Sequence, residues 1–182
     1  MYSPNNVSAC VVLDASQTTD VEGDMLTFAW YVDLDGDGMP DDNNQDGSPD
    51  PIGIGSVITN CFDVGEVKVW LVVSDGQCTS QKTVMIDVIT AGEAVDYLIG
   101  KVDAANIVRK NKRPFIATLK AAMASFDRES FVSGLNQLEA FINKTRAQVA
   151  PSNPADAAEW TAIARGIIAS FEGTDAITPR NE

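Results

Sequence analysis

The sequence MLTFAWYV, residues 25–32, runs directly into DLDGDGMPDDNNQDGSPD, residues 33–50. The first part is rich in aromatic and β-branched residues and predicts a β-strand. The second part consists of two consecutive nine-residue blocks, each with the pattern Asp-x-Asp/Asn-x-Asp-Gly-x-Pro-Asp. The glycine at position 6 of each block permits the sharp turn that a short wrapping loop needs. The stretch therefore predicts a strand that leads into a long, doubled acidic loop.

The doubled loop carries side-chain oxygens at regular positions, as a calcium site requires. Ca²⁺ takes about six to eight oxygen ligands in flexible geometry. The seven aspartates of this loop would repel one another strongly without a cation between them. A solvated acidic loop is the alternative, since runs of like charge are usually exposed. The repeated register and the absence of Lys and Arg favour calcium, with these predicted ligands: Asp33, Asp35, Asp37, Asp41, Asp42, Asn44, Asp46 and Asp50.

The loop does not fit an EF-hand, which needs a bidentate glutamate at position 12 and flanking helices. Position 12 counted from the two block starts is Asn44 and Gly53. The layout is similar to the calcium-binding aspartate repeats of thrombospondin type 3. Asn44 is also position 3 of the second block, which would let the two sites share a ligand. A weaker cluster, Asp20, Glu22 and Asp24, is either a further cation site or a polar turn.

Short strand-like runs separated by turn signals continue through the first half of the chain. We expect strands at residues 9–13, 25–32, 54–60, 66–74 and 83–89. This pattern predicts a β-sandwich. Trp30 is expected between its two sheets, with a ligand-stacking platform as the alternative role.

The stretch VVLDASQTTDVEGDMLTFAWYVDLDGDG, residues 11–38, resembles the PKD (polycystic-kidney-disease) repeat. VGEVKVWLVVSDG, residues 64–76, is similar to the closing strand and turn of that family. The resemblance covers about residues 7–89 and departs from the family at Val21-Glu22 and at the inserted doubled block. It implies an all-β immunoglobulin-like sandwich that serves extracellular proteins as a non-catalytic spacer or adhesion module. The matching positions are Leu13-Asp14-Ala15-Ser16, Asp20, Gly23-Asp24, Leu26-Thr27, Trp30 and Asp37-Gly38.

The negative charge of the chain is confined to its first half. Residues 1–90 contain 15 acidic and 2 basic residues, whereas residues 91–182 contain 11 of each. This asymmetry predicts two domains, 1–90 and 91–182, and the acidic half disfavours nucleic acid and anionic membranes. The absence of histidine excludes His-based triads and His-ligated zinc. No apolar run is long enough for a membrane span. We expect no enzymatic activity, because calcium accounts for the carboxylates.

Three cysteines leave one unpaired if a disulfide forms. The strand at residues 66–74 would separate Cys61 from Cys78 by about 30 Å, which is too far for a disulfide. If the strands alternate in direction, Cys10 and Cys78 fall at the same end. We therefore predict a Cys10–Cys78 disulfide with Cys61 free, and three reduced thiols are the alternative. Calcium loops of this type suit the outside of the cell, which favours the oxidised state.

After residue 89 the apolar residues follow a helical period, which predicts an all-α bundle of about four helices. Asn153-Pro154 fits the start of the fourth helix, and Gly173 fits its end. The sequence KRPFIATLKAAMASFDRESFVSGLNQLEAFINKTRAQV, residues 112–149, resembles the FIMAH-type helical module at the C-terminal ends of secreted bacterial proteins. The resemblance covers about residues 94–171 and implies no catalytic residues. The basic cluster at residues 109–113 is expected in a solvated inter-helix loop. Its alternatives are docking on the acidic half, on an anionic glycan or on a partner.

Together these features predict a calcium-binding accessory module of a secreted or cell-surface bacterial protein. Its expected partners are other domains of a larger protein, and the N-terminus MYSPNN lacks signal-peptide features, which indicates a fragment or a mature form. One alternative is a structural subunit of a calcium-dependent extracellular assembly. Another is a glycan-binding module with Trp70, Tyr31 and the basic cluster as contacts.

Overall fold

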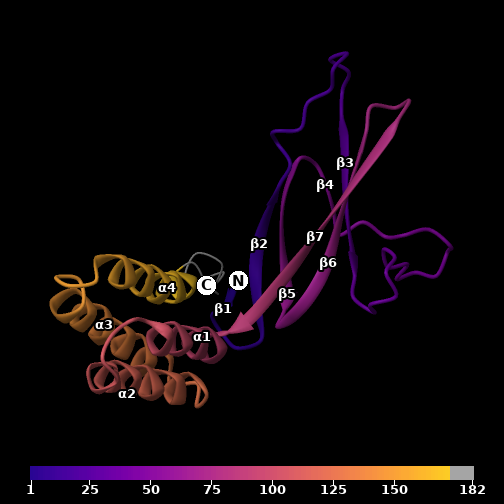
Figure 1. Ribbon diagram of the computed structural model, residues 1–182. Coiled ribbons are helices and arrows are strands. Elements are labelled where there is room, and N and C mark those ends of the chain that lie inside the picture. Colours follow the sequence, from indigo (N-terminus) through magenta and orange to yellow (C-terminus); the bar gives the residue numbers. More distant parts are fainter. Residues whose placement is uncertain (173–182) are drawn as a thin grey trace, which may run out of the picture. The chain divides into compact units, whose positions relative to one another are not determined.

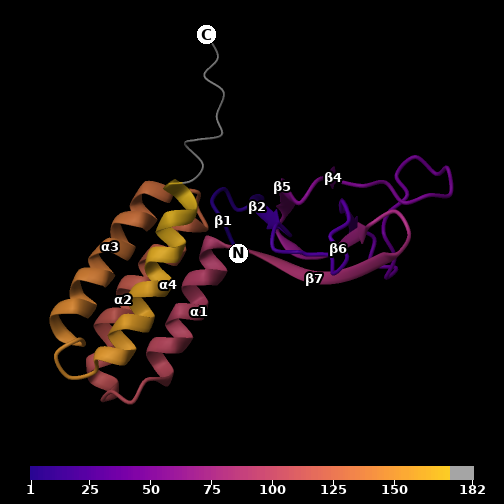
Figure 2. The same ribbon diagram turned by 90° about the horizontal axis from the view of Figure 1, so that it is seen from above.

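The computed structural model describes residues 1–172, which form a β region followed by four packed helices (Figures 1 and 2). The chain divides into two compact units. We call residues 8–88, with Met1, the β unit, and residues 2–7 with the chain from Ile89 onward the helical unit. The predicted order of a β part and a helical part is confirmed, and Gly173 lies outside the described residues.

The strands form a curled mixed sheet and a separate two-stranded sheet. The five-stranded sheet has the order β1-β7-β6-β3-β4, and its β1 runs parallel to the end of β7. The second sheet pairs β2 with β5 in antiparallel orientation. The strand bounds are β1 Tyr2–Ser3, β2 Ser8–Asp14, β3 Thr27–Asp33, β4 Gly53–Ile54, β5 Val57–Asp63, β6 Gly65–Ser74 and β7 Thr79–Thr90.

The core of the β unit lies between these two sheets. Trp30 and Val69 of the larger sheet pack in one buried cluster with Leu13 and Phe62 of the smaller sheet. Only 5% of Trp30 is exposed, and its indole Nε1 donates a hydrogen bond to the Gly55 carbonyl oxygen at 2.9 Å. Trp30 is therefore a core residue with a satisfied donor, as expected, and not a stacking platform.

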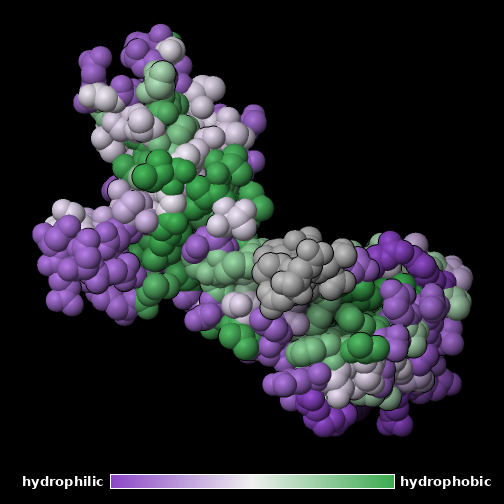
Figure 3. Space-filling view, turned by 180° about the vertical axis from the view of Figure 1, so that it is seen from behind, coloured by the Kyte–Doolittle hydropathy of each residue, from purple (hydrophilic) through white to green (hydrophobic). Residues whose placement is uncertain are grey.

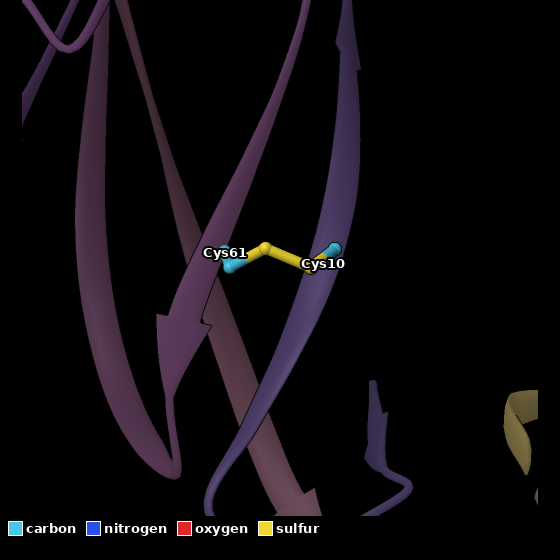
Figure 4. The surroundings of a disulfide bond; sticks show 2 residues. All are labelled: Cys10 and Cys61. Carbon is cyan, nitrogen blue, oxygen red and sulfur yellow. A yellow bond between two sulfur atoms is a disulfide. The ribbon is translucent and has the colours of Figure 1, made fainter. Parts of the chain in front are cut away.

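The disulfide joins Cys10 to Cys61 (Figure 4), so the predicted Cys10–Cys78 pairing is wrong. The prediction compared the ends of strands that alternate along the chain. In the structure β2 and β5 are direct neighbours, and their register places Cys10 opposite Cys61. Cys78 follows β6 in the turn to β7, and its thiol is free and exposed.

The exposed thiol of Cys78 leads to a chemical prediction. One equivalent of an aromatic disulfide reagent should react with the native protein, because the other two cysteines are bonded to each other. The Cys78→Ser variant should release no chromophore. Two or more reactive thiols in the native protein would contradict the observed pairing.

The four helices form a single bundle in which each helix packs against the next and α4 also contacts α1. Its core contains apolar side chains that recur at the helical period, among them Leu98, Leu119, Leu138 and Trp160. Thr90 and Glu93 cap the first helix reciprocally, which satisfies two backbone N–H groups.

None of the described helices combines the length and apolar character that crossing a bilayer needs. The helix bounds are α1 Ala91–Ala104, α2 Arg109–Phe126, α3 Phe131–Gln148 and α4 Pro154–Glu172.

The basic cluster lies in the first turn of α2, not in an inter-helix loop as expected. Arg109, Lys110 and Arg113 are exposed. Lys112 is buried, and its Nζ donates to the Asp103 carbonyl oxygen near the end of α1. Lys112 thus contributes to the packing of α2 against α1.

Close packing of α2 on α3 makes Gly134 sensitive to substitution. A Cβ atom at Gly134 would lie 2.6 Å from the ring of Phe126, which is fully buried. Gly134→Ala should therefore lower the free energy of unfolding by about 1–3 kcal/mol. Gly100→Ala is the matched control, because a Cβ there meets nothing within 4 Å. It should raise the free energy of unfolding by about 0.5–1 kcal/mol. Urea unfolding followed by helical circular dichroism measures both, and equal effects would contradict the packing described.

Candidate metal centre

The acidic loop connects β3 to β4 and extends away from the strands (Figure 1). It forms the hydrophilic lobe at the left of the space-filling view (Figure 3). Asp33, at the end of β3, is 6% exposed, whereas Asp35 and Asp37 are exposed. A carboxylate buried to this degree needs hydrogen bonds or a cation.

The first block wraps its backbone N–H groups around its own carboxylates. The two oxygens of Asp33 accept from the backbone N–H groups of Gly36 at 2.8 Å and Gly38 at 3.0 Å. Asp35 accepts from the N–H of Asp37 at 3.0 Å, and Asp37 accepts from that of Met39 at 2.8 Å. Position 9 closes the block, because Asp41 accepts from the N–H of Leu34 at position 2.

The second block repeats four of these contacts, but Asp42 accepts its other N–H from Asp46 at position 5, whereas Asp33 accepts it from Gly36 at position 4. Asp42, at position 1, accepts from the N–H of Gly47 at position 6, at 2.8 Å. Asn44 accepts from the N–H of Asp46 at 2.9 Å, and Asp46 accepts from that of Ser48 at 2.9 Å. Asp50, at position 9, accepts from the N–H of Asn43 at position 2.

The backbone conformation is also similar in the two blocks. Positions 4 and 6 have positive φ in both blocks, at Gly36 and Gly38 and again at Gln45 and Gly47. The N–H of Asp41 donates to the Val32 carbonyl, and the N–H of Asp50 donates to the Asp41 carbonyl, nine residues apart in both cases. The two blocks thus have the same local fold, which a disordered acidic run would not have.

Three carboxylates of the first block converge. Asp33, Asp35 and Asp37 each place one oxygen within 4.8 Å of the others, a grouping that could hold a metal ion. A carboxylate oxygen that accepts one N–H keeps a further lone pair for a cation. In the second block the middle position is the amide of Asn44, so Asp42 and Asp46 are the charged groups of that set.

Within residues 1–172, no basic side chain forms a salt bridge with a carboxylate of the loop. Over residues 1–172 the salt bridge found is Lys101–Glu159, far along the chain from the loop. Lys68 contacts the loop, but its Nζ donates to the Gly38 carbonyl oxygen at 3.3 Å and not to a carboxylate. Seven carboxylates that accept backbone N–H groups and form no salt bridge with the described residues favour an external cation.

The weaker cluster at residues 20–24 has a different geometry. Asp20 accepts from the N–H groups of Gly23 at 2.8 Å and Asp24 at 3.0 Å, which closes a turn. Within the described residues, Asp20, Glu22 and Asp24 do not converge as the first block does. Asp75 closes a similar turn after β6, where the N–H groups of Cys78 and Gln77 lower the pKa of its carboxyl.

The sequence patterns did not identify two features of the loop. Lys68 contacts Gly38 from β6, a pairing distant in sequence that composition does not signal. Gln45 has φ of 59°, although it is not a glycine. Gln45 occupies the same repeat position as Gly36, position 4, and this equivalence could have predicted its positive φ.

No protein-family model, curated protein or solved structure matches this chain. The resemblances to the PKD repeat, the thrombospondin type 3 loop and the FIMAH-type module therefore rest on the quoted residues alone.

Proposed function

We propose that the chain is a calcium-binding, non-catalytic module of a secreted or cell-surface protein. In this proposal the β unit is a PKD-like, immunoglobulin-like sandwich, and the helical unit is a FIMAH-like accessory bundle. The two nine-residue blocks each hold one calcium ion, and the bound ions stiffen the loop between β3 and β4. The module would act as a spacer or adhesion element beside other domains of a larger protein.

The observation that carries this proposal is the repeated hydrogen-bond pattern of the two blocks. In both, the side chains at positions 1, 3, 5 and 9 accept backbone N–H groups. These positions are also the predicted ligands. Backbone donors fix the side-chain oxygens in place before a cation arrives, which lowers the ordering cost of binding.

The Cys10–Cys61 disulfide supports the extracellular part of the proposal, since disulfides persist in oxidising compartments. Extracellular calcium is abundant enough to fill sites of modest affinity. Calcium would bring the aspartates together without repulsion and hold a long loop that contributes few residues to the core.

Block-specific variants test the proposal. Asp37→Asn and Asp46→Asn keep an oxygen that accepts the N–H of Met39 or Ser48 and remove only the negative charge. Each variant should lose one of two calcium sites in competition with a chromophoric chelator, and the double variant should lose both. Asp63→Asn, an exposed carboxylate in β5, is the matched control and should bind as the parent does. Two unchanged sites in the double variant would refute the assignment.

A further inference from the structure

A groove of about 330 Å³ lies in the β unit between the acidic loop and the larger sheet. We call it the outer groove. The sheet contributes Tyr31, Trp70 and Gln81, and the loop contributes Met39, Pro40 and Pro49. Its volume is at the lower end of the range of small-ligand sites, about 300–1,000 Å³.

The sheet side of the groove is the face turned away from the core. Along β3 and β6, Trp30 and Val69 are buried in the core, and Tyr31 and Trp70 are their neighbours on the opposite face. The register pairs Tyr31 directly with Trp70. Two aromatic side chains thus stand next to each other on a solvent-facing sheet, where packing of the core does not need them.

The loop side of the groove is built from the calcium blocks themselves. Position 8 of both blocks is proline, and both Pro40 and Pro49 line the groove. Each proline directly precedes the position 9 aspartate, and Met39 donates its N–H to Asp37. The apolar wall of the groove is therefore made of residues adjacent to the proposed calcium ligands.

Lys68 contacts both the sheet side and the loop side of the groove. Its Nζ lies 4.3 Å from the ring centroid of Trp70 and donates to the Gly38 carbonyl oxygen of the first block. The indole Nε1–H of Trp70 is buried and has no acceptor among the described residues. An ordered water is the usual partner of a buried donor of this kind.

We propose that the outer groove binds a sugar ring of a polysaccharide that carries no acidic groups. The aromatic side chains of Tyr31 and Trp70 give the groove an apolar wall against which a pyranose ring packs, and the Gln81 amide offers polar contacts to its hydroxyl groups. The net charge of residues 1–90 is −13, and the loop beside the groove carries seven aspartates. Uronic or sulfated sugars are therefore repelled, whereas uncharged and amino sugars are not.

The calcium dependence of this binding rests on the proposed function. Without the cation, repulsion among the aspartates weakens the hold on the loop, so the Met39, Pro40 and Pro49 wall is less firmly ordered. Calcium should therefore strengthen sugar binding at least about tenfold, by ordering a preformed site.

The test uses the whole chain and calorimetric titration with cellohexaose, chitohexaose, a deacetylated chitosan hexamer and a hyaluronan hexamer. We expect binding of at least one of the first three in calcium and none of the hyaluronan hexamer. Tyr31→Ala and Trp70→Ala should weaken binding at least about tenfold. Tyr97→Ala, an exposed tyrosine of α1, is the matched control and should leave it unchanged. Circular dichroism verifies that each variant is folded.

The outcomes separate the two proposals. Calcium binding in the chelator competition with no binding of any of the three hexamers overturns the groove and leaves the calcium function standing. Binding that Tyr31→Ala does not weaken, or equal affinity for hyaluronan, also overturns the groove. Sugar binding that is the same in calcium and in EDTA overturns the calcium dependence.

Discussion

Removal of calcium with EDTA is expected to lower the melting temperature of the β unit by at least about 10 °C. A ligand present at 100 times its dissociation constant stabilises the folded state by about 2.7 kcal/mol per site. For a unit of about 80 residues, each kcal/mol shifts the melting temperature by about 4–8 °C. The expected physical cause is the repulsion among seven aspartates, which the folded loop concentrates when no cation is present.

The helical unit provides an internal control for this experiment. Its helices carry no grouping of metal-ligating side chains like that of the first block among the residues described. The loss of the helical circular dichroism signal on heating should therefore occur at the same temperature with and without calcium. Tryptophan fluorescence, followed in a Trp160→Phe variant, reports on Trp30 and Trp70 of the β unit. An identical β-unit transition in calcium and EDTA would contradict the stabilising role of the ion.

Removal of the disulfide is expected to have the second large effect. The Cys10→Ser/Cys61→Ser double variant should lose about 2–4 kcal/mol of stability, because the bond closes a segment with a sequence separation of 51. The sheet formed by β2 and β5 has only two strands, and a two-stranded sheet alone is marginally stable. That sheet contributes Ala9, Leu13 and Phe62 to the core of the β unit.

Urea unfolding of the double variant measures this contribution, with Cys78→Ser as the matched control. The control removes a thiol that is exposed and unbonded, so its stability should stay within about 0.5 kcal/mol of the parent. Equal stability of the double variant and the parent would show that strand pairing alone holds the smaller sheet.

The features predicted correctly from the sequence are local ones. The helices follow from apolar residues at helical spacing, such as Leu98 and Leu138, whose burial the bundle requires. The acidic cluster follows from alternate aspartates at positions 33, 35 and 37, which a turn at Gly36 and Gly38 brings together. In both cases the contacts join residues a few positions apart, so the spacing alone carries the information.

The features that sequence reasoning missed depend on which strands become neighbours. The Cys10–Cys61 bond follows from the pairing of β2 with β5, and spacing along the chain does not reveal that choice. The pairing of β1 with the end of β7 joins Tyr2 to Ile89, and no pattern in the first residues predicts it. The outer groove arises for the same reason, since it needs Tyr31 beside Trp70 and the loop residues Met39, Pro40 and Pro49 near both.

Calorimetric titration of the metal-free protein with calcium counts the ions that the doubled block binds. We expect two calcium ions per chain, one for each nine-residue block, and no heat of binding in the Asp37→Asn/Asp46→Asn double variant. Absence of binding to the parent protein would contradict the account and leave the doubled block as a structured but solvated acidic loop.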